Sequence, residues 1–151
     1  MPPIVIVDTS VLLNVLDVSG FNQDRDAVLD RFEELVDDGA NLLLPMGAVF
    51  ETGNHIAQLP DGQQRRQYAE VLRDEVRRAL EGRALWTPLQ LPDAEQLADW
   101  LEGFPDAAMQ GAGMVDLSII KAWERTCAQH PGHRVEIWSL DRHLTGYDRV
   151  P

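Results

Sequence analysis

The sequence predicts an α/β fold, a three-layer sandwich in which helices flank a mainly parallel central sheet. Short apolar runs that suit buried strands alternate along the chain with longer segments of helical periodicity, which is the pattern of α/β proteins. No Asn-Gly or similar hairpin signal joins two of these runs, so neighbouring strands are expected to be parallel. The chain has 151 residues, of which 44% are apolar. That size predicts a single domain over residues 1–151 with its own core.

The first predicted strand is the run Ile4–Val7, which consists of four consecutive β-branched residues. Such a run is typical of a strand that is covered on both faces, as in a parallel sheet. A short apolar helix over residues 11–16 follows, and Thr9 or Ser10 is placed to cap it. Residues 18–24 are polar and are expected to form a connection.

The next segments continue the alternation of helix and strand. Residues 28–36 place apolar side chains at helical spacing, and Gly39 gives a suitable stop for that helix. Residues 41–44 read as a short buried strand, because three leucines are followed at once by a proline. Residues 49–59 predict a further helix, which ends at a Pro-Asp-Gly turn.

The second half of the chain repeats the pattern. Its predicted elements are a long helix over 63–82, an extended segment over 85–91, a helix over 92–101, a loop over 104–112, a helix over 115–129 and a final strand over 135–138. The loop is predicted because residues 104–112 are rich in Gly and Ala and contain a proline.

The chain is strongly acidic, with 25 acids, 13 bases and a net charge of −12. This balance argues against broad binding to nucleic acid through a basic surface. It allows two functional interpretations, a carboxylate cluster that holds divalent cations or a surface that meets a basic partner. Solubility alone is the simplest explanation of the charge.

Other features of the composition predict a cytoplasmic protein without a membrane segment. Cys127 is the only cysteine, so no disulfide can form within the chain, which suits a reducing compartment. No apolar run approaches the roughly 20 residues that span a bilayer. No basic region precedes the first strand, as it would in a secretory signal.

Four acids follow or flank the predicted strands in a similar way. Asp8 comes directly after the first strand, Asp141 lies just past the end of the last strand, and Glu51 lies on the helix after the second strand. Asp116 lies in the first turn of a later helix. Because the carboxyl ends of parallel strands share one edge of a sheet, the four side chains are expected to converge. Taken singly, each has an ordinary structural explanation as a helix cap, a first-turn acid, a surface residue or a turn residue.

A bare cluster of four carboxylates is electrostatically unfavourable, because like charges at close range repel. A divalent cation removes this cost, and carboxylate oxygens are the ligands that Mg²⁺ and Mn²⁺ prefer. Two such ions about 3.5–4 Å apart form the clamp that enzymes use for in-line cleavage of phosphodiesters. Hydroxyl groups flank two of the acids, at Thr9, Ser10 and Ser139.

Four segments around these acids resemble the motifs of PIN-domain nucleases, most closely the VapC-type toxins of bacterial toxin–antitoxin pairs. The segments are Ile4–Leu13, Leu44–Glu51, Met114–Ala122 and Ile137–Leu144. The resemblance implies a ribonuclease that depends on Mg²⁺ or Mn²⁺. Its catalytic and metal-binding acids would be Asp8, Glu51, Asp116 and Asp141.

The resemblance also implies supporting residues and partners. Thr9 and Ser10 match the hydroxyls beside the first acid, and Ser139 stands where the family usually has Thr. Asn14 is a candidate supporting polar group, with a surface helix residue as the alternative. The family implies an antitoxin that inserts a segment with a basic side chain near the acids, and it implies a homodimer.

Several alternatives stay open from the sequence. A PIN-fold interaction module without nuclease activity would use the same acids to bind a partner or a structural ion. A phosphatase of the haloacid dehalogenase type also begins with a strand and Asp, but it needs a second Asp where this chain has Ser10. Arg66, Arg73 and Arg77 share one face of the long helix and are candidates for RNA contacts. An exposed helix with mixed charges is the simpler explanation of them.

Overall fold

The computed structural model describes residues 1–151 and contains one five-stranded sheet in the order β3-β2-β1-β4-β5. The strands are β1 (Ile4–Val7), β2 (Asn41–Leu44), β3 (Trp86–Pro88), β4 (Val135–Trp138) and β5 (Asp148–Arg149). The strands β1 to β4 are parallel to one another, and β5 pairs with β4 in the antiparallel direction. The predicted α/β class with a mainly parallel sheet is therefore confirmed.

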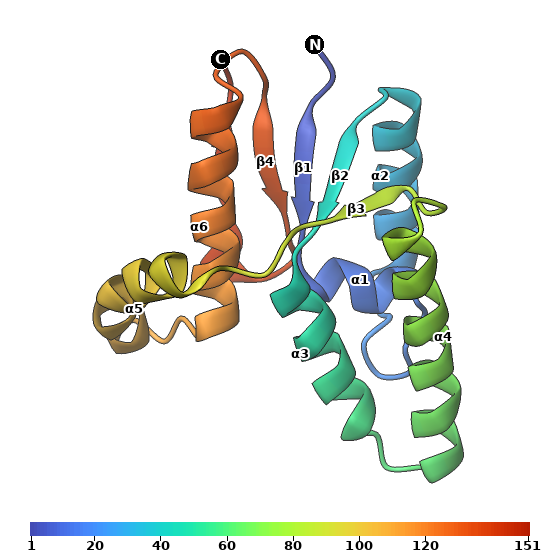
Figure 1. Cartoon of the computed structure of the whole chain (residues 1–151). Coiled ribbons are helices and arrows are strands. Elements are labelled where there is room, and N and C mark those ends of the chain that lie inside the picture. Colours follow the sequence, from blue (N-terminus) through green and yellow to red (C-terminus); the bar gives the residue numbers. More distant parts are fainter.

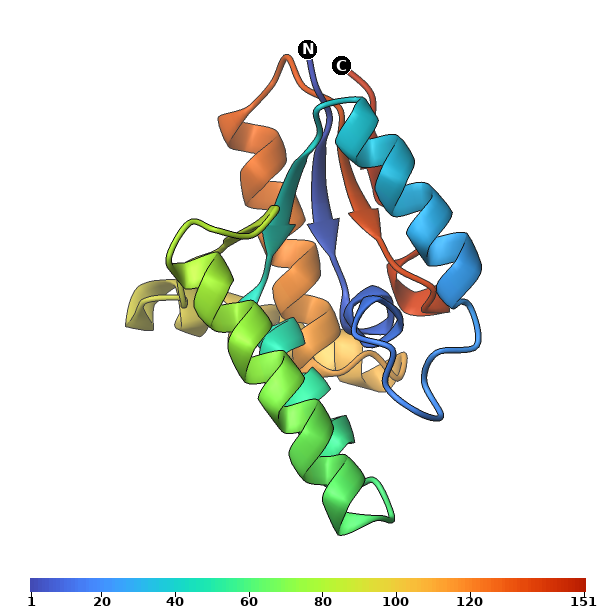
Figure 2. The same ribbon diagram turned by 90° about the vertical axis from the view of Figure 1, so that its right-hand side faces the viewer.

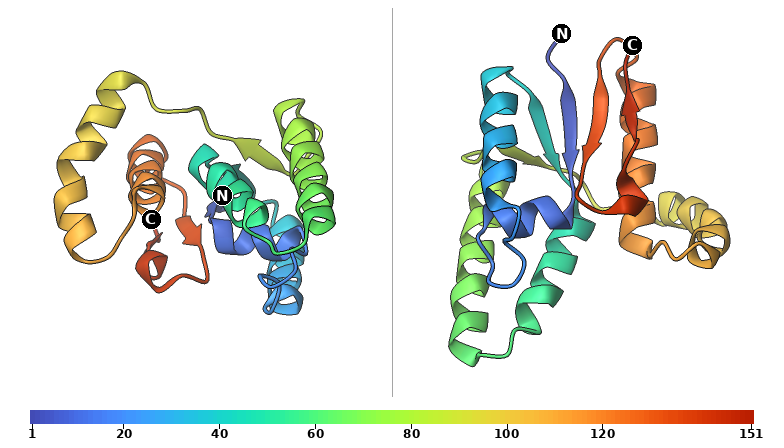
Figure 3. Two further views of the ribbon diagram at one scale, coloured as in Figure 1. Left: turned by 90° about the horizontal axis from the view of Figure 1, so that it is seen from below. Right: turned by 180° about the vertical axis from the view of Figure 1, so that it is seen from behind.

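Helices cover both faces of this sheet (Figure 1). They are α1 (Thr9–Val15), α2 (Arg25–Asp37), α3 (Met46–Ala57), α4 (Gly62–Leu80), α5 (Ala94–Met109) and α6 (Met114–Gln129), and a single 3₁₀ turn covers Arg142–Leu144. α3 and α4 form an arm that extends beyond the sheet (Figure 2). α5 packs on the outer side of α6, and the two termini lie at the opposite end of the molecule from the arm (Figure 3). None of these helices has both the length and the apolar character that a membrane crossing requires.

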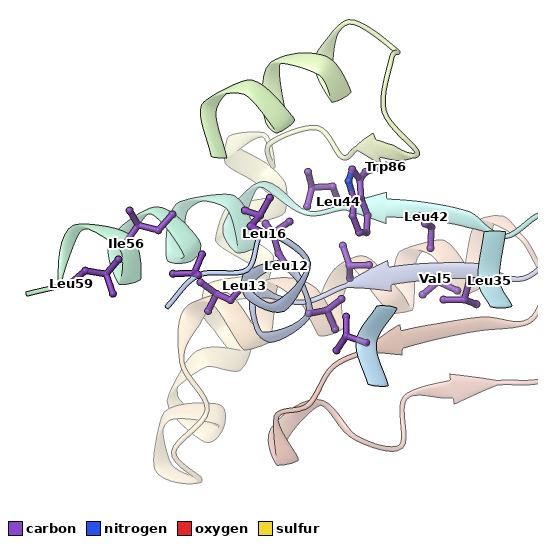
Figure 4. Packing of buried hydrophobic residues seen from close by; sticks show 14 residues of the cluster. Val5, Leu12, Leu13, Leu16, Leu35, Leu42, Leu44, Ile56, Leu59 and Trp86 are labelled. Carbon is purple, nitrogen blue, oxygen red and sulfur yellow. The ribbon is translucent and has the colours of Figure 1, made fainter. Parts of the chain in front are cut away.

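The alternating side chains of β1 divide the core into two parts. Val5 and Val7 point into a large cluster with α1, α2 and the strands β2 and β3 (Figure 4). Ile6 points to the other face, where it packs against Ile119 of α6 and Ile137 of β4. All four residues of β1 are buried, as the β-branched run predicts. Burial of each such side chain stabilises the fold by about 1.5–3 kcal/mol. The buried strand β1 therefore fixes the position of Asp8, which follows it directly.

The structure corrects three details of the sequence-based prediction. α5 continues to Met109, so the loop predicted over residues 104–112 is wrong for most of its length. Pro105 removes one backbone donor from α5, but residues 106–109 include two alanines and a methionine, which are strong helix formers. α1 begins directly after Asp8, so neither Thr9 nor Ser10 precedes the helix as its cap. β5 was not predicted, since two residues carry no periodic signal.

Candidate active site

The site lies at the carboxyl ends of the parallel strands. Asp8 follows β1, and its backbone N–H donates to the carbonyl of Trp138, the last residue of β4, at 3.1 Å. Ser139 therefore follows β4 at the same level as Asp8 follows β1. Figure 1 shows that α1, α3 and α6 all begin below these strand ends. The topology thus brings segments that are far apart in the sequence to one edge of the sheet.

A cleft of about 270 Å³ opens at this edge and gathers all four of the acids predicted from the sequence. A fifth carboxylate lines the cleft as well, while no Lys or Arg does so. The five acids are Asp8, Asp24, Glu51, Asp116 and Asp141. The local charge is therefore negative without any fixed cation to balance it.

Asp8 is the most deeply buried of these acids, with only 4% of its surface exposed. Its Oδ2 atom accepts hydrogen bonds from Ser10 Oγ at 2.9 Å and from Ser139 Oγ at 2.6 Å. Although Asp8 stands at the N-terminus of α1, its side chain makes no capping bond to that helix. The carboxylate is thus oriented by hydroxyl groups toward the cleft, and the helix-cap explanation does not account for it.

The two serines also fix the loop that carries Asp141. The backbone N–H of Leu140 donates to Ser10 Oγ at 3.0 Å, and that of Asp141 donates to Ser139 Oγ at 2.9 Å. Asp141 in turn accepts a bond from the backbone N–H of His143 at 2.9 Å through Oδ1. Each hydroxyl therefore joins Asp8 to the segment after β4, so the positions of Asp8 and Asp141 are coupled.

The negative charges of the cleft affect the pKa of Asp116. Partial burial raises the pKa of Asp116, and the negative charges of Asp141, Asp8 and Glu51 raise it further in that order. A hydrogen bond from the backbone of Gly113 opposes this shift by lowering the pKa. Repulsion from all three of the other predicted acids shows that the four carboxylates share one electrostatic environment.

The cleft contains the carboxylate oxygens that a divalent cation needs, but they are too far apart to coordinate one ion as they stand. No three His, Cys, Asp or Glu side chains lie close enough together to hold a metal ion as they stand. Repulsion between carboxylates favours such separation when no cation is present. The available oxygens are hard ligands, the type that suits Mg²⁺ or Mn²⁺. The residues of the cleft therefore fit a divalent cation that would draw the acids inward.

Thr9 and Asn14 support this arrangement from α1. Thr9 is buried, and its Oγ1 donates to Glu51 Oε2 at 3.4 Å, so it joins α1 to α3. Asn14 is buried too: its amide donates to the carbonyl of Ser10 at 2.9 Å and its Oδ1 accepts from the backbone N–H of Asp24 at 3.1 Å. The alternative that Asn14 is a surface residue is wrong, because it links α1 to the loop that follows.

The close approach of α3 and α6 depends on Gly47. A Cβ atom at this position would lie 3.1 Å from Ser118 Oγ and 3.6 Å from a methyl group of Val115. Gly47 lies one turn before Glu51, while Val115 and Ser118 flank Asp116. The absence of a side chain at Gly47 thus lets the two helices bring their acids to the same cleft.

Gly47→Val is expected to destabilise the protein by about 1–3 kcal/mol, because the added methyl groups overpack the contact between α3 and α6. Urea unfolding measures the loss, and any cleavage activity should fall in parallel as Glu51 and Asp116 move apart. Gly103→Val is the matched control, since a Cβ at Gly103 meets no atom within 4 Å. Equal stability of the two variants would contradict this role of Gly47.

The residues of the cleft that the sequence analysis missed include one further acid and two aromatic side chains. Asp24 and Phe21 come from the connection between α1 and α2, and His55 comes from α3. His55 Nε2 lies 3.7 Å from Glu51 Oε1, and their spacing of four residues on a helix is a signal that was available in the sequence. Asp24 and Phe21 offered no such signal, because their positions depend on the path of an irregular loop.

The three arginines proposed for RNA contacts lie elsewhere. Arg66, Arg73 and Arg77 line a groove of about 830 Å³ between α3 and α4, and none of them lines the acidic cleft. Apolar side chains make up most of the other walls of the groove, and no acid lines it. Contact of these arginines with RNA stays a prediction, and the structure separates them from the acids.

Comparison with known proteins identifies the fold. A scan against protein-family models and a search of curated proteins found no match. The chain is similar to the crystal structure of FitAcB from Neisseria gonorrhoeae, with 21% identity and a TM-score of 0.58 over 95% of this chain and 91% of that chain. It is also similar to VapBC2 from Rickettsia felis bound to a DNA fragment from their promoter, with 13% identity and a TM-score of 0.52 over 90% of this chain and 99% of that chain. The chain therefore has the PIN-domain fold that its motifs predicted.

Proposed function

We propose that this protein is an endoribonuclease that depends on Mg²⁺ or Mn²⁺ and serves as the toxin of a toxin–antitoxin pair. One observation carries the proposal: four acids that are far apart in the sequence line a single cleft at the carboxyl ends of the sheet, with no Lys or Arg among the lining residues. Together with the PIN-domain fold, this donor set favours hydrolysis of phosphodiesters over the other chemistries of α/β proteins.

The chain's own residues have distinct parts in this proposal. Asp8, Glu51, Asp116 and Asp141 would hold the cation, which when bound supplies an activated water and balances charge on the phosphate. Ser10 and Ser139 orient the carboxylate of Asp8, as their hydrogen bonds indicate. Thr9 restrains Glu51, and Asn14 holds the loop that forms one wall of the cleft.

The proposal is tested by incubating the purified protein with a labelled single-stranded RNA and resolving the products on a gel. We expect cleavage with Mg²⁺ or Mn²⁺, and none after EDTA or with Ca²⁺ alone, because Ca²⁺ favours larger and more flexible coordination than Mg²⁺. Cleavage that survives EDTA would contradict a metal-dependent reaction.

A second candidate function is a PIN-fold interaction module that binds a partner or a structural ion without cleaving RNA. The net charge of −12 and a cleft lined by five acids and no Lys or Arg favour this alternative, because they suit a basic protein partner better than an RNA backbone. The same assay separates the two functions. Binding of Mn²⁺ without cleavage of any of several unrelated RNAs would favour the module.

The antitoxin part of the proposal is supported by the comparisons, since both similar structures are toxin–antitoxin complexes. The acidic cleft suits a basic side chain inserted by such a partner. A homodimer is proposed as well. α5 buries none of its residues fully and exposes Leu97 and Leu101, one turn apart, so it presents an apolar face that a second copy could cover.

A further inference from the structure

We propose that Phe21 and His55 form a subsite that stacks a nucleobase of single-stranded RNA next to the scissile phosphate. Their rings lie with centroids 4.9 Å apart and planes tilted by 48°. Both residues line the acidic cleft, although they come from different elements, the connection after α1 and the helix α3. This inference rests on the proposed nuclease function and names the form of RNA that the cleft would accept.

His55 places the aromatic pair beside Glu51, one of the acids proposed to bind the cation. Its Nε2 lies 3.7 Å from Glu51 Oε1, so one edge of the imidazole faces an acid proposed to bind the cation. The side chain of His55 keeps 34% of its surface exposed. Phe21 is half-buried and packs against the main core cluster, which gives the pair a rigid support. A base resting on this wall would be adjacent to the phosphate held at the carboxylates.

The charge of the cleft explains why a stacking contact is needed. Proteins commonly hold RNA through Lys and Arg contacts to phosphates, but no such side chain lines this cleft and the net charge of the chain is −12. Apart from the phosphate at the cation, binding inside the cleft must then come from contacts that do not depend on positive charge. Stacking on aromatic side chains is such a contact, and it strengthens binding by about 5- to 150-fold for each base.

The same reasoning selects single-stranded over double-stranded RNA. In a duplex the faces of the bases are covered by their neighbours, and only unpaired bases can splay out onto an aromatic side chain. Loops and single strands are therefore the expected substrates, with the stacked base at a fixed distance from the cut.

The test compares His55→Ala with His55→Phe on a labelled single-stranded RNA whose cleavage site has been mapped. Both variants lose the contact with Glu51, but only His55→Phe keeps an aromatic ring. We expect His55→Ala to raise KM by about 5- to 150-fold with little change in kcat, and His55→Phe to restore most of the loss. His130→Ala, an equal deletion at a histidine outside the cleft, should leave KM unchanged.

A second substrate isolates the base itself. An RNA with an abasic nucleotide in place of the stacked base should be cleaved with the same KM by the wild-type protein and by His55→Ala. If the difference between them persists on every abasic substrate near the cut, or if both His55 variants lower kcat at unchanged KM, the ring does not act by stacking and the subsite is wrong.

Binding measured without cleavage separates this inference from the proposed function. In the presence of Ca²⁺, with which we expect no cleavage, the fluorescence change of 2-aminopurine placed near the cut should be lost in His55→Ala and kept in His55→Phe. A wild-type protein that gives this fluorescence change but never cleaves with Mg²⁺ or Mn²⁺ would overturn the nuclease and keep the subsite. One that cleaves, with His55→Ala indistinguishable from it, would overturn the subsite alone.

Discussion

Asp8→Asn is expected to lower kcat/KM for RNA cleavage by a factor of about 10² to 10³ or more, while the fold persists. The substitution keeps the shape of a side chain that is only 4% exposed, so packing is preserved. It removes the negative charge that Ser10 and Ser139 hold in place, and with it a ligand of the proposed cation. Loss of one positioned electrostatic group costs an enzyme this much in rate, and metal ligands are at the upper end.

The measurement combines steady-state kinetics with thermal unfolding. Asp30→Asn serves as the matched control, because Asp30 is exposed on α2 and lies outside the cleft, so the same loss of charge should not alter cleavage. Wild-type activity in Asp8→Asn, with the dependence on Mg²⁺ or Mn²⁺ intact, would remove Asp8 from the site. If Asp8→Asn is both inactive and unfolded, Asp8→Glu tests the assignment instead. This variant keeps the negative charge but shifts the carboxylate, so we expect it to fold and to cleave RNA slowly.

Asp116→Asn is expected to stabilise the metal-free protein at neutral pH. Burial and the charges of Asp141, Asp8 and Glu51 raise the pKa of Asp116, which means that the folded state disfavours its ionised form. An amide at this position removes that cost. For a domain of this size each 1 kcal/mol of relief raises Tm by about 2–4 °C. A gain of stability on removing a residue of the proposed active site is typical of sites that evolved for function rather than for stability.

The pH dependence gives the sign of this effect. Because the pKa of Asp116 in the folded state lies above its ordinary value of 3.8, the folded protein holds this proton more tightly than the unfolded chain does. The stabilisation from protonation is complete below about pH 3.8 and is lost as the pH rises through the raised pKa. The difference in Tm between Asp116→Asn and the wild type should therefore grow as the pH increases from acid to neutral. A difference that shrinks over this interval would contradict the account.

Divalent cations should reverse the order of stability. Mn²⁺ at concentrations well above its Kd stabilises the folded wild-type protein, by about 2.7 kcal/mol at 100 times Kd, since it binds only the folded site. Asp116→Asn lacks one ligand, so we expect it to gain much less from Mn²⁺ and to lose its activity. A variant that is more stable without the metal and less responsive to it is the signature of a carboxylate kept for cation binding.

The sequence predicted the parts of the fold that depend on local patterns. The β-branched run at Ile4–Val7 and the helical periodicity of α2 and α6 reflect burial on known faces, so the strand, the helices and the parallel order could be inferred. The prediction failed at α5, where Pro105 and nearby glycines signalled a loop, and at β5, whose two residues pair only because β4 lies beside them. These elements are decided by neighbours rather than by their own residues.

Some residues of the candidate site could be predicted from the sequence and others could not. Asp8, Glu51, Asp116 and Asp141 could be proposed from the sequence because each follows a predicted strand or begins a helix at one edge of the sheet. Asp24 and Phe21 could not be proposed, because the connection between α1 and α2 reaches the cleft through the buried amide of Asn14, a contact that no periodicity encodes. The separation of the acids was also outside the reach of the sequence, since it depends on side-chain conformations.

The most direct test of the shared cation is a crystal of the protein soaked in Mn²⁺, with anomalous scattering used to locate the ion. We expect one or two peaks in the cleft, in contact with the carboxylates of Asp8, Glu51, Asp116 and Asp141, which move closer together to reach the ion. An empty cleft at saturating Mn²⁺, or manganese bound only at other surfaces of the protein, would contradict the central claim that these acids form one metal centre.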